Sequence, residues 1–219
     1  MTDARALLQR AEAAAAQGRA SESLRLTEEA VDAAESPRLK FDALLQRARA
    51  EVAAGQPAKA LDTYWEARHV TKRHRLGRAG EADLGIGMMM LDLGRPGEGL
   101  EAVRRAARYF RKAGSTFLRG CAETVLADEA LKSGDLSIAQ RHLEVATDLL
   151  EAANEPRMVS AALTLRAEAL ARLGRSHEAG TLLARAEQVA QRVANPEIQA
   201  ELKQRRADVR ELLGPPSAS

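Results

Sequence analysis

Five glycines recur along this 219-residue chain at intervals of 37 to 40 residues, and they are Gly18, Gly55, Gly94, Gly134 and Gly174. Each one follows an apolar run with helical periodicity and precedes another such run. A glycine in that place predicts a helix ending on a left-handed residue, a conformation that other residue types adopt only at a cost. A fixed period of this length is typical of repeat proteins in which each repeat is one supersecondary unit.

Other positions, counted from the glycines, are equally regular. The residue twelve positions after each glycine is alanine in every copy, namely Ala30, Ala67, Ala106, Ala146 and Ala186. The residue seven positions before each glycine is small every time, namely Ala11, Ala48, Gly87, Ala127 and Ala167. Small residues at fixed points on two helices let their backbones approach closely. The pattern therefore predicts five tightly packed helical hairpins.

The prolines support the same register. Five of the seven fall at the expected first turns of helices, namely Pro37, Pro57, Pro96, Pro156 and Pro196. Proline is tolerated there because its missing N–H would have no partner and its fixed φ is helical. Aromatic residues make up only 3% of the chain, so alanine and leucine must form the interior, and no alternating strand pattern is present. We predict an all-α chain of eleven helices.

The residue nine positions after each glycine is mostly bulky, namely Thr27, Tyr64, Val103, Leu143 and Leu183. Small, glycine, alanine and bulky residues at these spacings resemble the tetratricopeptide repeat (TPR), most clearly in GQPAKALDTYWEARHV (55–70) and GDLSIAQRHLEVATDLL (134–150). The period, nearer 40 than 34 residues, resembles that of bacterial regulator and kinesin-light-chain-like TPR arrays. The resemblance implies a right-handed α-α superhelix, a TPR-like solenoid of five helical hairpins plus a C-terminal capping helix. We expect one solenoid over 1–213, with repeats at about 3–36, 37–77, 78–114, 115–154 and 155–195, the cap at 196–213 and a disordered tail at 214–219.

In TPR proteins the first helix of each hairpin lines a concave groove, and the resemblance assigns groove positions to this chain. They are Arg5, Leu8, Gln9 and Glu12; Asp42, Leu45, Gln46 and Arg49; Glu81, Leu84, Gly85, Met88 and Leu91; Thr124, Val125, Asp128 and Lys132; and Thr164, Leu165, Glu168 and Arg172. The Lys/Asn pairs of a carboxylate clamp for chaperone C-termini are replaced by residues such as Leu8, Glu12 and Gln46.

The centre of this groove is apolar, so it would suit an amphipathic helix or short hydrophobic peptide of a partner protein. The expected partner-binding residues are Leu45, Arg49, Leu84, Met88, Leu91, Val125 and Asp128. Methionine adapts its shape to a ligand. The alternative interpretation is that Met88, Met89 and Met90 only fill irregular gaps in a helix loosened by glycine.

Positive charge is concentrated in two segments, 66–78 and 101–119, which carry five and six Lys or Arg residues against one acid each. Both belong to second helices, of repeats two and three, so the resemblance predicts one basic patch. Its expected members are Arg68, Lys72, Arg73, Arg104, Arg105 and Arg108. The patch could be a solvated face, a surface for an acidic protein or, least favoured for lack of stacking aromatics, one for nucleic acid.

Trp65 follows the bulky position of repeat two and admits two interpretations. It could pack between adjacent hairpins, as most tryptophans are largely buried. It could instead be an exposed anchor of an interface, where tryptophan is over-represented.

Residue patterns for chemistry are not evident. The histidines (His69, His74, His142 and His177) and Cys121 show no zinc-ligand spacing. Cys121 has no base adjacent in the sequence, and GIGMMMLDLG (85–94) lies within a helical repeat rather than after a strand. We therefore expect no enzyme activity, no catalytic residues, no metal and no cofactor.

The remaining features concern location and class of function. The net charge is +2, the single cysteine fits a reducing compartment, and neither a secretory signal nor an apolar membrane span is recognisable. We expect a soluble cytoplasmic protein that acts as a protein-binding adaptor or scaffold. The alternatives are a self-assembling homo-oligomer, since repeat arrays leave their end faces uncovered, and the sensor module of a bacterial signalling or transcription system.

Overall fold

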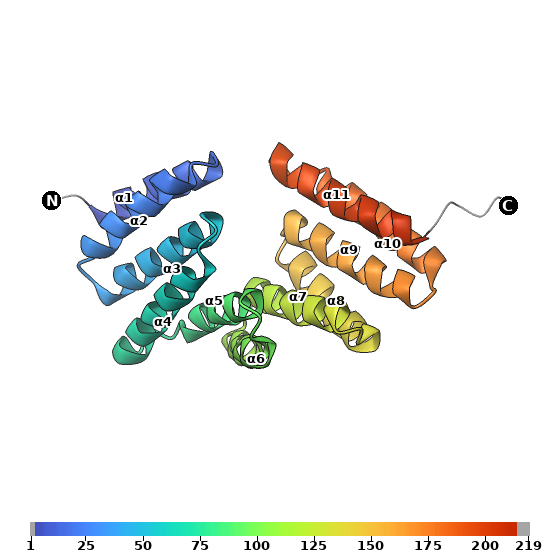
Figure 1. Ribbon diagram of the computed structural model, residues 1–219, viewed down its shortest axis with the longest axis horizontal. Coiled ribbons are helices and arrows are strands. Elements are labelled where there is room, and N and C mark those ends of the chain that lie inside the picture. Colours follow the sequence, from blue (N-terminus) through green and yellow to red (C-terminus); the bar gives the residue numbers. More distant parts are fainter. Residues whose placement is uncertain (1–2, 214–219) are drawn as a thin grey trace. The chain divides into compact units, whose positions relative to one another are not determined.

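The computed structural model describes residues 3–213 and contains eleven helices within that range, as the sequence predicts (Figure 1). In chain order they are α1 (Ala4–Ala16), α2 (Ala20–Asp32), α3 (Pro37–Ala53), α4 (Pro57–His74), α5 (Ala79–Asp92), α6 (Pro96–Ala113), α7 (Thr116–Lys132), α8 (Leu136–Ala152), α9 (Pro156–Arg172), α10 (Ser176–Ala190) and α11 (Pro196–Leu213). The tail predicted at 214–219 lies outside the described residues. None of the described helices is long and apolar enough to cross a membrane.

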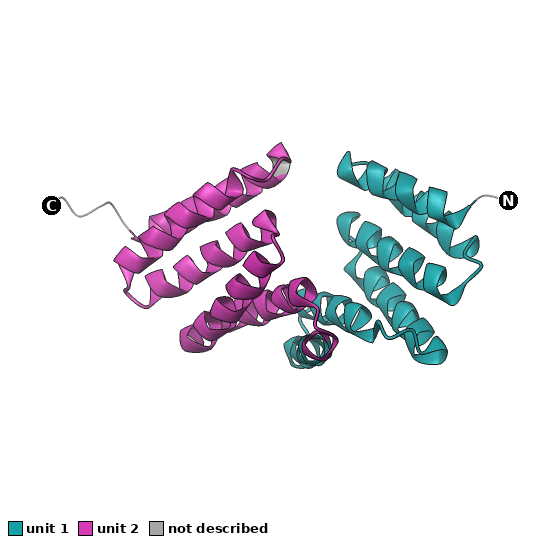
Figure 2. Ribbon diagram, turned by 180° about the vertical axis from the view of Figure 1, so that it is seen from behind, with its two compact units in different colours: residues 1–109 teal, residues 110–219 magenta. Residues whose placement is uncertain are grey.

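The chain forms two compact units, residues 1–109 and 110–219, and the boundary falls within α6 (Figure 2). Each unit has hairpins and buried clusters of its own, so the two are described separately. The expected single solenoid over 1–213 remains a prediction.

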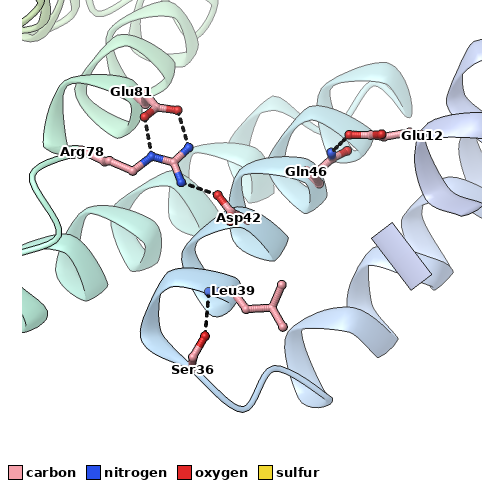
Figure 3. A network of polar contacts seen from close by, with 7 residues as sticks. All are labelled: Glu12, Ser36, Leu39, Asp42, Gln46, Arg78 and Glu81. Carbon is pink, nitrogen blue, oxygen red and sulfur yellow. Dashed lines mark hydrogen bonds and ion pairs between the residues drawn. The ribbon is translucent and has the colours of Figure 1, made fainter. Parts of the chain in front are cut away.

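In the first unit, α1 packs on α2, α2 on α3, α3 on α4 and α4 on α5. The prolines at the starts of α3 and α4 occupy first turns, and the Ser36 hydroxyl caps α3 by accepting a hydrogen bond from the Leu39 N–H at 3.2 Å (Figure 3). The core consists mainly of leucine and alanine around a fully buried Phe41 and a buried Tyr64. Because aromatic residues are scarce, alanine and leucine side chains fill the interior, and the helices lie close together.

Glycines make the closest helix contacts in this unit. A Cβ atom on Gly87 would lie 2.5 Å from Val103 Cγ2 and 2.9 Å from the Gly99 carbonyl oxygen, so α5 and α6 meet where α5 has no room for a side chain. A Cβ on Gly85 would lie 2.3 Å from the Tyr64 ring, which rests on the α5 backbone. Helix α5 tolerates several glycines because these contacts compensate for their low helix propensity.

In the second unit, α7 packs on α8, α8 on α9 and α9 on α10, and α11 packs against both α9 and α10. Leucine and alanine again fill the interior, with Leu143, Leu150 and Leu163 fully buried. The turn after α8 has no glycine, and Asn154 adopts the left-handed conformation there with φ of 55°. Asparagine is the residue type that most readily replaces glycine in that conformation.

Candidate protein-binding surfaces

On the first-helix face of the first unit, the groove positions Asp42 and Glu81 are joined through Arg78 (Figure 3). Arg78 donates from Nε and Nη2 to the two Glu81 carboxylate oxygens at 2.7 and 2.8 Å, and from Nη1 to Asp42. Its guanidinium also lies over the Phe41 ring, 4.6 Å from the centroid. The hydrogen bonds that Arg78 donates to Glu81, and then the one to Asp42, raise the pKa of Arg78. This network ties α3 to the start of α5.

A second contact joins the groove positions of α1 and α3, where the Gln46 amide donates to the Glu12 carboxylate (Figure 3). Four of the polar groove positions of this unit are therefore engaged with one another or with Arg78. Because a ligand would have to compete with these partners, the polar rim of the first unit serves first to hold its helices together.

The apolar groove positions of the first unit divide into two groups. Leu45 is 4% exposed and packs in the core, and Leu84 is 9% exposed, so neither offers much surface to a ligand, which corrects the prediction for these two side chains. Met88 is 43% exposed, Leu91 is half-buried and Arg49 is exposed. Of the three methionines, Met89 and Met90 fill the core and Met88 does not. Of the expected partner-binding residues in this unit, Arg49, Met88 and Leu91 therefore offer surface to a ligand.

The second unit has a hollow of about 340 Å³ on the faces of its first helices α7, α9 and α11. Its lining residues are Asp128 of α7; Thr164, Leu165, Glu168 and Arg172 of α9; and Arg205, Asp208, Val209 and Leu212 of α11. Leu165 and Val209 are buried, whereas Leu212 is 55% exposed. The hollow is thus apolar in part and flanked by side chains of both charges.

The charged groups around this hollow differ in how firmly they are held. Arg172 pairs with Glu168 at 2.5 Å and also donates to the Leu131 carbonyl at 3.0 Å. Asp128 pairs with Lys132 at 2.9 Å, and the hydrogen bonds that Lys132 donates to Glu129 and then to Asp128 raise the pKa of Lys132. Arg205 makes no ion pair with any described side chain, so its charge is the one most available to a ligand.

Three expected groove positions of this unit are not part of the lining, namely Thr124, Val125 and Lys132, and of these Val125 is half-buried. The α11 residues of the hollow were missed because α11 was taken only as a cap. A signal was present in the sequence: Gly214 follows Gly174 by 40 residues, and Ala207 stands seven before it. Helix α11 therefore has the sequence pattern of a first helix.

The expected basic patch is partly neutralised by an acid from the helix between its two parts. Asp83 of α5 is 6% exposed and accepts from Arg68 Nε of α4 at 2.7 Å and Arg105 Nη2 of α6 at 3.5 Å. Arg108 forms an ion pair with Glu101, with Nη2 and Oε1 3.3 Å apart. The remaining expected members, Lys72, Arg73 and Arg104, are exposed. Arg68 and Arg105 join α4, α5 and α6 through Asp83, so their charges are partly neutralised, and the patch itself stays a prediction.

Trp65 is 40% exposed, and the Arg68 guanidinium lies over its ring at 5.6 Å from the centroid. The side chain is therefore exposed rather than buried between hairpins. An exposed tryptophan fits the alternative of an interface anchor, which stays a prediction.

Cys121 and His142 are the described groups whose surroundings bear on chemistry. Burial raises the pKa of the Cys121 thiol to about 11, and the negative charge of Glu155 adds to the effect. His142 Nδ1 lies 2.8 Å from a Glu123 carboxylate oxygen. Across residues 3–213, no three His, Cys, Asp or Glu side chains are grouped as metal ligands would be. At neutral pH the Cys121 side chain is a protonated thiol and therefore a poor nucleophile.

No protein-family model matches the chain, and no curated protein matches it either. Solved structures do. Aspartyl phosphate phosphatase F from Bacillus subtilis has a TM-score of 0.77 and 13% identity, covering 93% of this chain and 54% of that one. A Rap protein complexed with Competence and Sporulation Factor has a TM-score of 0.76 and 15% identity. That match covers 94% of this chain and 66% of the Rap chain.

The TPR-like repeats of a putative kinesin light chain from Podosopora anserina give a TM-score of 0.64 and 18% identity, covering 86% of this chain and 97% of that one. At such identities the likeness concerns the fold and not the activity. It agrees with the repeat register, the hairpins and the left-handed glycines described above. The chain is a TPR-like helical repeat protein.

Proposed function

We propose that the chain is a protein-binding adaptor whose second unit holds a short segment of a partner in the hollow on α7, α9 and α11. The observation that carries this proposal is the composition of that hollow, an apolar floor between charged side chains of both signs. Helical and extended peptides bind such surfaces through a few apolar anchors, and charged groups around the anchors fix their orientation.

The lining also indicates which segment would fit. Leu212, together with the exposed edges of Leu165 and Val209, would contact an apolar anchor. Arg205 lacks an intramolecular carboxylate partner among the described residues and would pair with an acidic side chain of the ligand. The paired charges of Arg172 and Glu168 would add orientation rather than affinity, because a ligand must displace an existing partner.

Two further observations support a binding role over a catalytic one. The structurally similar Rap protein was solved in complex with Competence and Sporulation Factor, so this kind of fold can hold a bound factor. We propose that the chain itself is not an enzyme, since its Cys121 thiol keeps its proton at neutral pH. The phosphatase activity named for the protein from Bacillus subtilis is not extended to this chain. A reduced thiol also fits the cytoplasm, which we propose as the site of action.

The test is capture of partners on the full chain, followed by titration of the captured protein against three variants. Arg205→Glu and Leu212→Glu should each weaken binding by about tenfold or more, as expected for loss of a charge contact or an apolar anchor. Leu93→Glu changes a leucine of similar exposure, 39%, in the first unit and should leave binding unchanged. Equal loss for all three variants, or none for the first two, would remove the hollow as the binding site.

Light scattering on the purified chain examines the alternative of self-assembly. A concentration-independent monomer argues against a homo-oligomeric scaffold. A defined oligomer that Leu212→Glu dissociates would instead make a second copy of the chain the occupant of the hollow.

A further inference from the structure

The second unit contains a buried cation that is not matched by an acid. Arg206 of α11 is 5% exposed, and its Nε is buried without a hydrogen-bond partner. Its Nη1 donates to the Ser160 hydroxyl at 3.4 Å, a long contact. Ser160 is itself fully buried and uses its proton to donate to the Ala186 carbonyl at 2.9 Å. The Nε–H of Arg206 is therefore removed from water without a hydrogen bond in return.

The surrounding charges do not compensate for this burial. The charge of Glu187 favours the protonated form of Arg206, but the Glu187 carboxylate pairs with Arg210 at 2.7 Å. Other arginines of this unit, such as Arg166 and Arg185, each have a carboxylate within 3.0 Å. Loss of hydration lowers the pKa of Arg206, which indicates that its charged form is poorly stabilised in the unliganded chain. A buried charge normally has an anionic partner.

Arg206 also lines a hollow, separate from the one on the first-helix faces, that lies between α10 and α11 and measures about 380 Å³. Lys203 and Gln191 line it as well, and both are exposed. Glu187 also lines it, but its carboxylate pairs with Arg210 at 2.7 Å. The Lys203 ammonium, the Gln191 side-chain amide and the guanidinium of Arg206 can donate hydrogen bonds to an oxyanion. Arginine binds carboxylate and phosphate groups through just such pairs of N–H donors.

We propose that the hollow between α10 and α11 is a binding site for a small free anion carrying a phosphate or carboxylate group, with Arg206 as its central ligand and Lys203 as an outer one. The anion would supply the acid that Arg206 lacks. The volume of this hollow suits a small metabolite rather than a folded partner. This site does not depend on the proposed peptide site, since the two hollows are lined by different residues.

The experiment is calorimetric titration of the full chain with inorganic phosphate and with succinate, in buffer whose ionic strength is held constant with sodium chloride. The two ligands distinguish phosphate from carboxylate recognition. At least one should bind with saturation, and Arg206→Met should weaken that binding by about 10-fold to 100-fold, as expected for loss of charge-assisted hydrogen bonds. Arg205→Met removes the neighbouring exposed arginine, which faces the other hollow, and should not alter the affinity.

A second variant guards against misfolding of Arg206→Met. Lys203→Met changes an exposed side chain and should weaken the same binding several-fold while the unfolding midpoint without ligand stays unchanged. Absence of saturable binding by either anion overturns the proposal, as does equal weakening by Arg205→Met and Arg206→Met. A failure here would leave the peptide-binding variants Arg205→Glu and Leu212→Glu to be judged on their own titrations.

Discussion

Replacement of Gly87 by alanine adds a single methyl group where α5 and α6 meet. That methyl would lie 2.5 Å from Val103 Cγ2, 2.9 Å from the Gly99 carbonyl oxygen and 3.0 Å from the Val103 nitrogen. Two of these three neighbours are backbone atoms, so a change of side-chain rotamer cannot relieve the overlap. The two helices must separate, and the separation also loosens contacts around the buried Val103.

The magnitude follows from two opposing effects. Alanine in place of glycine favours a helix by about 1 kcal/mol. Overpacking of a close helix contact costs about 1–3 kcal/mol, and the backbone overlap places this site at the upper end. We expect Gly87→Ala to lower the free energy of unfolding by about 2 kcal/mol. Gly180→Ala is the matched control, because the added Cβ has no atom within 4 Å, and it should raise stability by up to about 1 kcal/mol.

Urea unfolding measures both variants. Trp65 is the chain's one tryptophan and lies in the first unit with Gly87, so its fluorescence reports that unit, while circular dichroism at 222 nm reports the helices of both. With a slope of about 2 kcal/mol per molar urea, Gly87→Ala should shift the fluorescence midpoint down by about 1 M. A midpoint equal to or above that of the unchanged chain would refute the close-packing argument, as would a comparable loss for Gly180→Ala.

Three further predictions concern other residues. Asp83→Asn removes the acid that serves Arg68 and Arg105, and urea unfolding should show a loss of about 2 kcal/mol, whereas an unchanged midpoint would mean that the partly exposed arginines are satisfied by water. Arg75 ends α4 at φ of 50°, so Arg75→Gly should relieve left-handed strain and stabilise the chain by about 1 kcal/mol; destabilisation in the same assay would contradict this. Burial raises the Cys121 pKa from 9.0 to about 11, so its contribution to stability is fully present below pH 9 and is lost as the pH rises toward 11. Iodoacetamide alkylation of the folded chain should accelerate with pH up to about 11, and a plateau near pH 9 would argue against burial of the thiol.

Local features of the fold were predictable from the sequence because they depend on a few neighbouring residues. The glycines at the 40-residue positions all have φ between 70° and 80°, and prolines begin α3, α4, α6, α9 and α11. A left-handed residue and a missing N–H impose these boundaries whatever packs around them. The turn at Asn154 escaped that reasoning, since its residue type only permits the conformation and does not require it.

The binding surfaces were less predictable because they depend on how many neighbours each helix has. Leu45 occupies a groove position in a single hairpin, but α3 contacts α1, α2 and α4, and this side chain is covered. The hollow of the second unit needed α11 as its third wall, and α11 contributes Arg205, Asp208, Val209 and Leu212. Repeat spacing identifies which residues are equivalent between hairpins. How far each side chain is buried depends on the helices that precede and follow its own.

The basic patch shows the same limitation for charge, and it changes how that patch must be tested. Counting charge along 66–78 and 101–119 omits Asp83, which stands between them in the chain and beneath them in the fold. Reversing Arg105 to Glu would place a second carboxylate beside a buried one, so weaker binding could result from unfolding alone. Reversal of Lys72, Arg73 and Arg104, which are exposed, changes the surface potential without disturbing that cluster. If this triple variant keeps its unfolding midpoint but loses an acidic partner, the patch is a docking surface; if it keeps the partner as well, the patch is a solvated face.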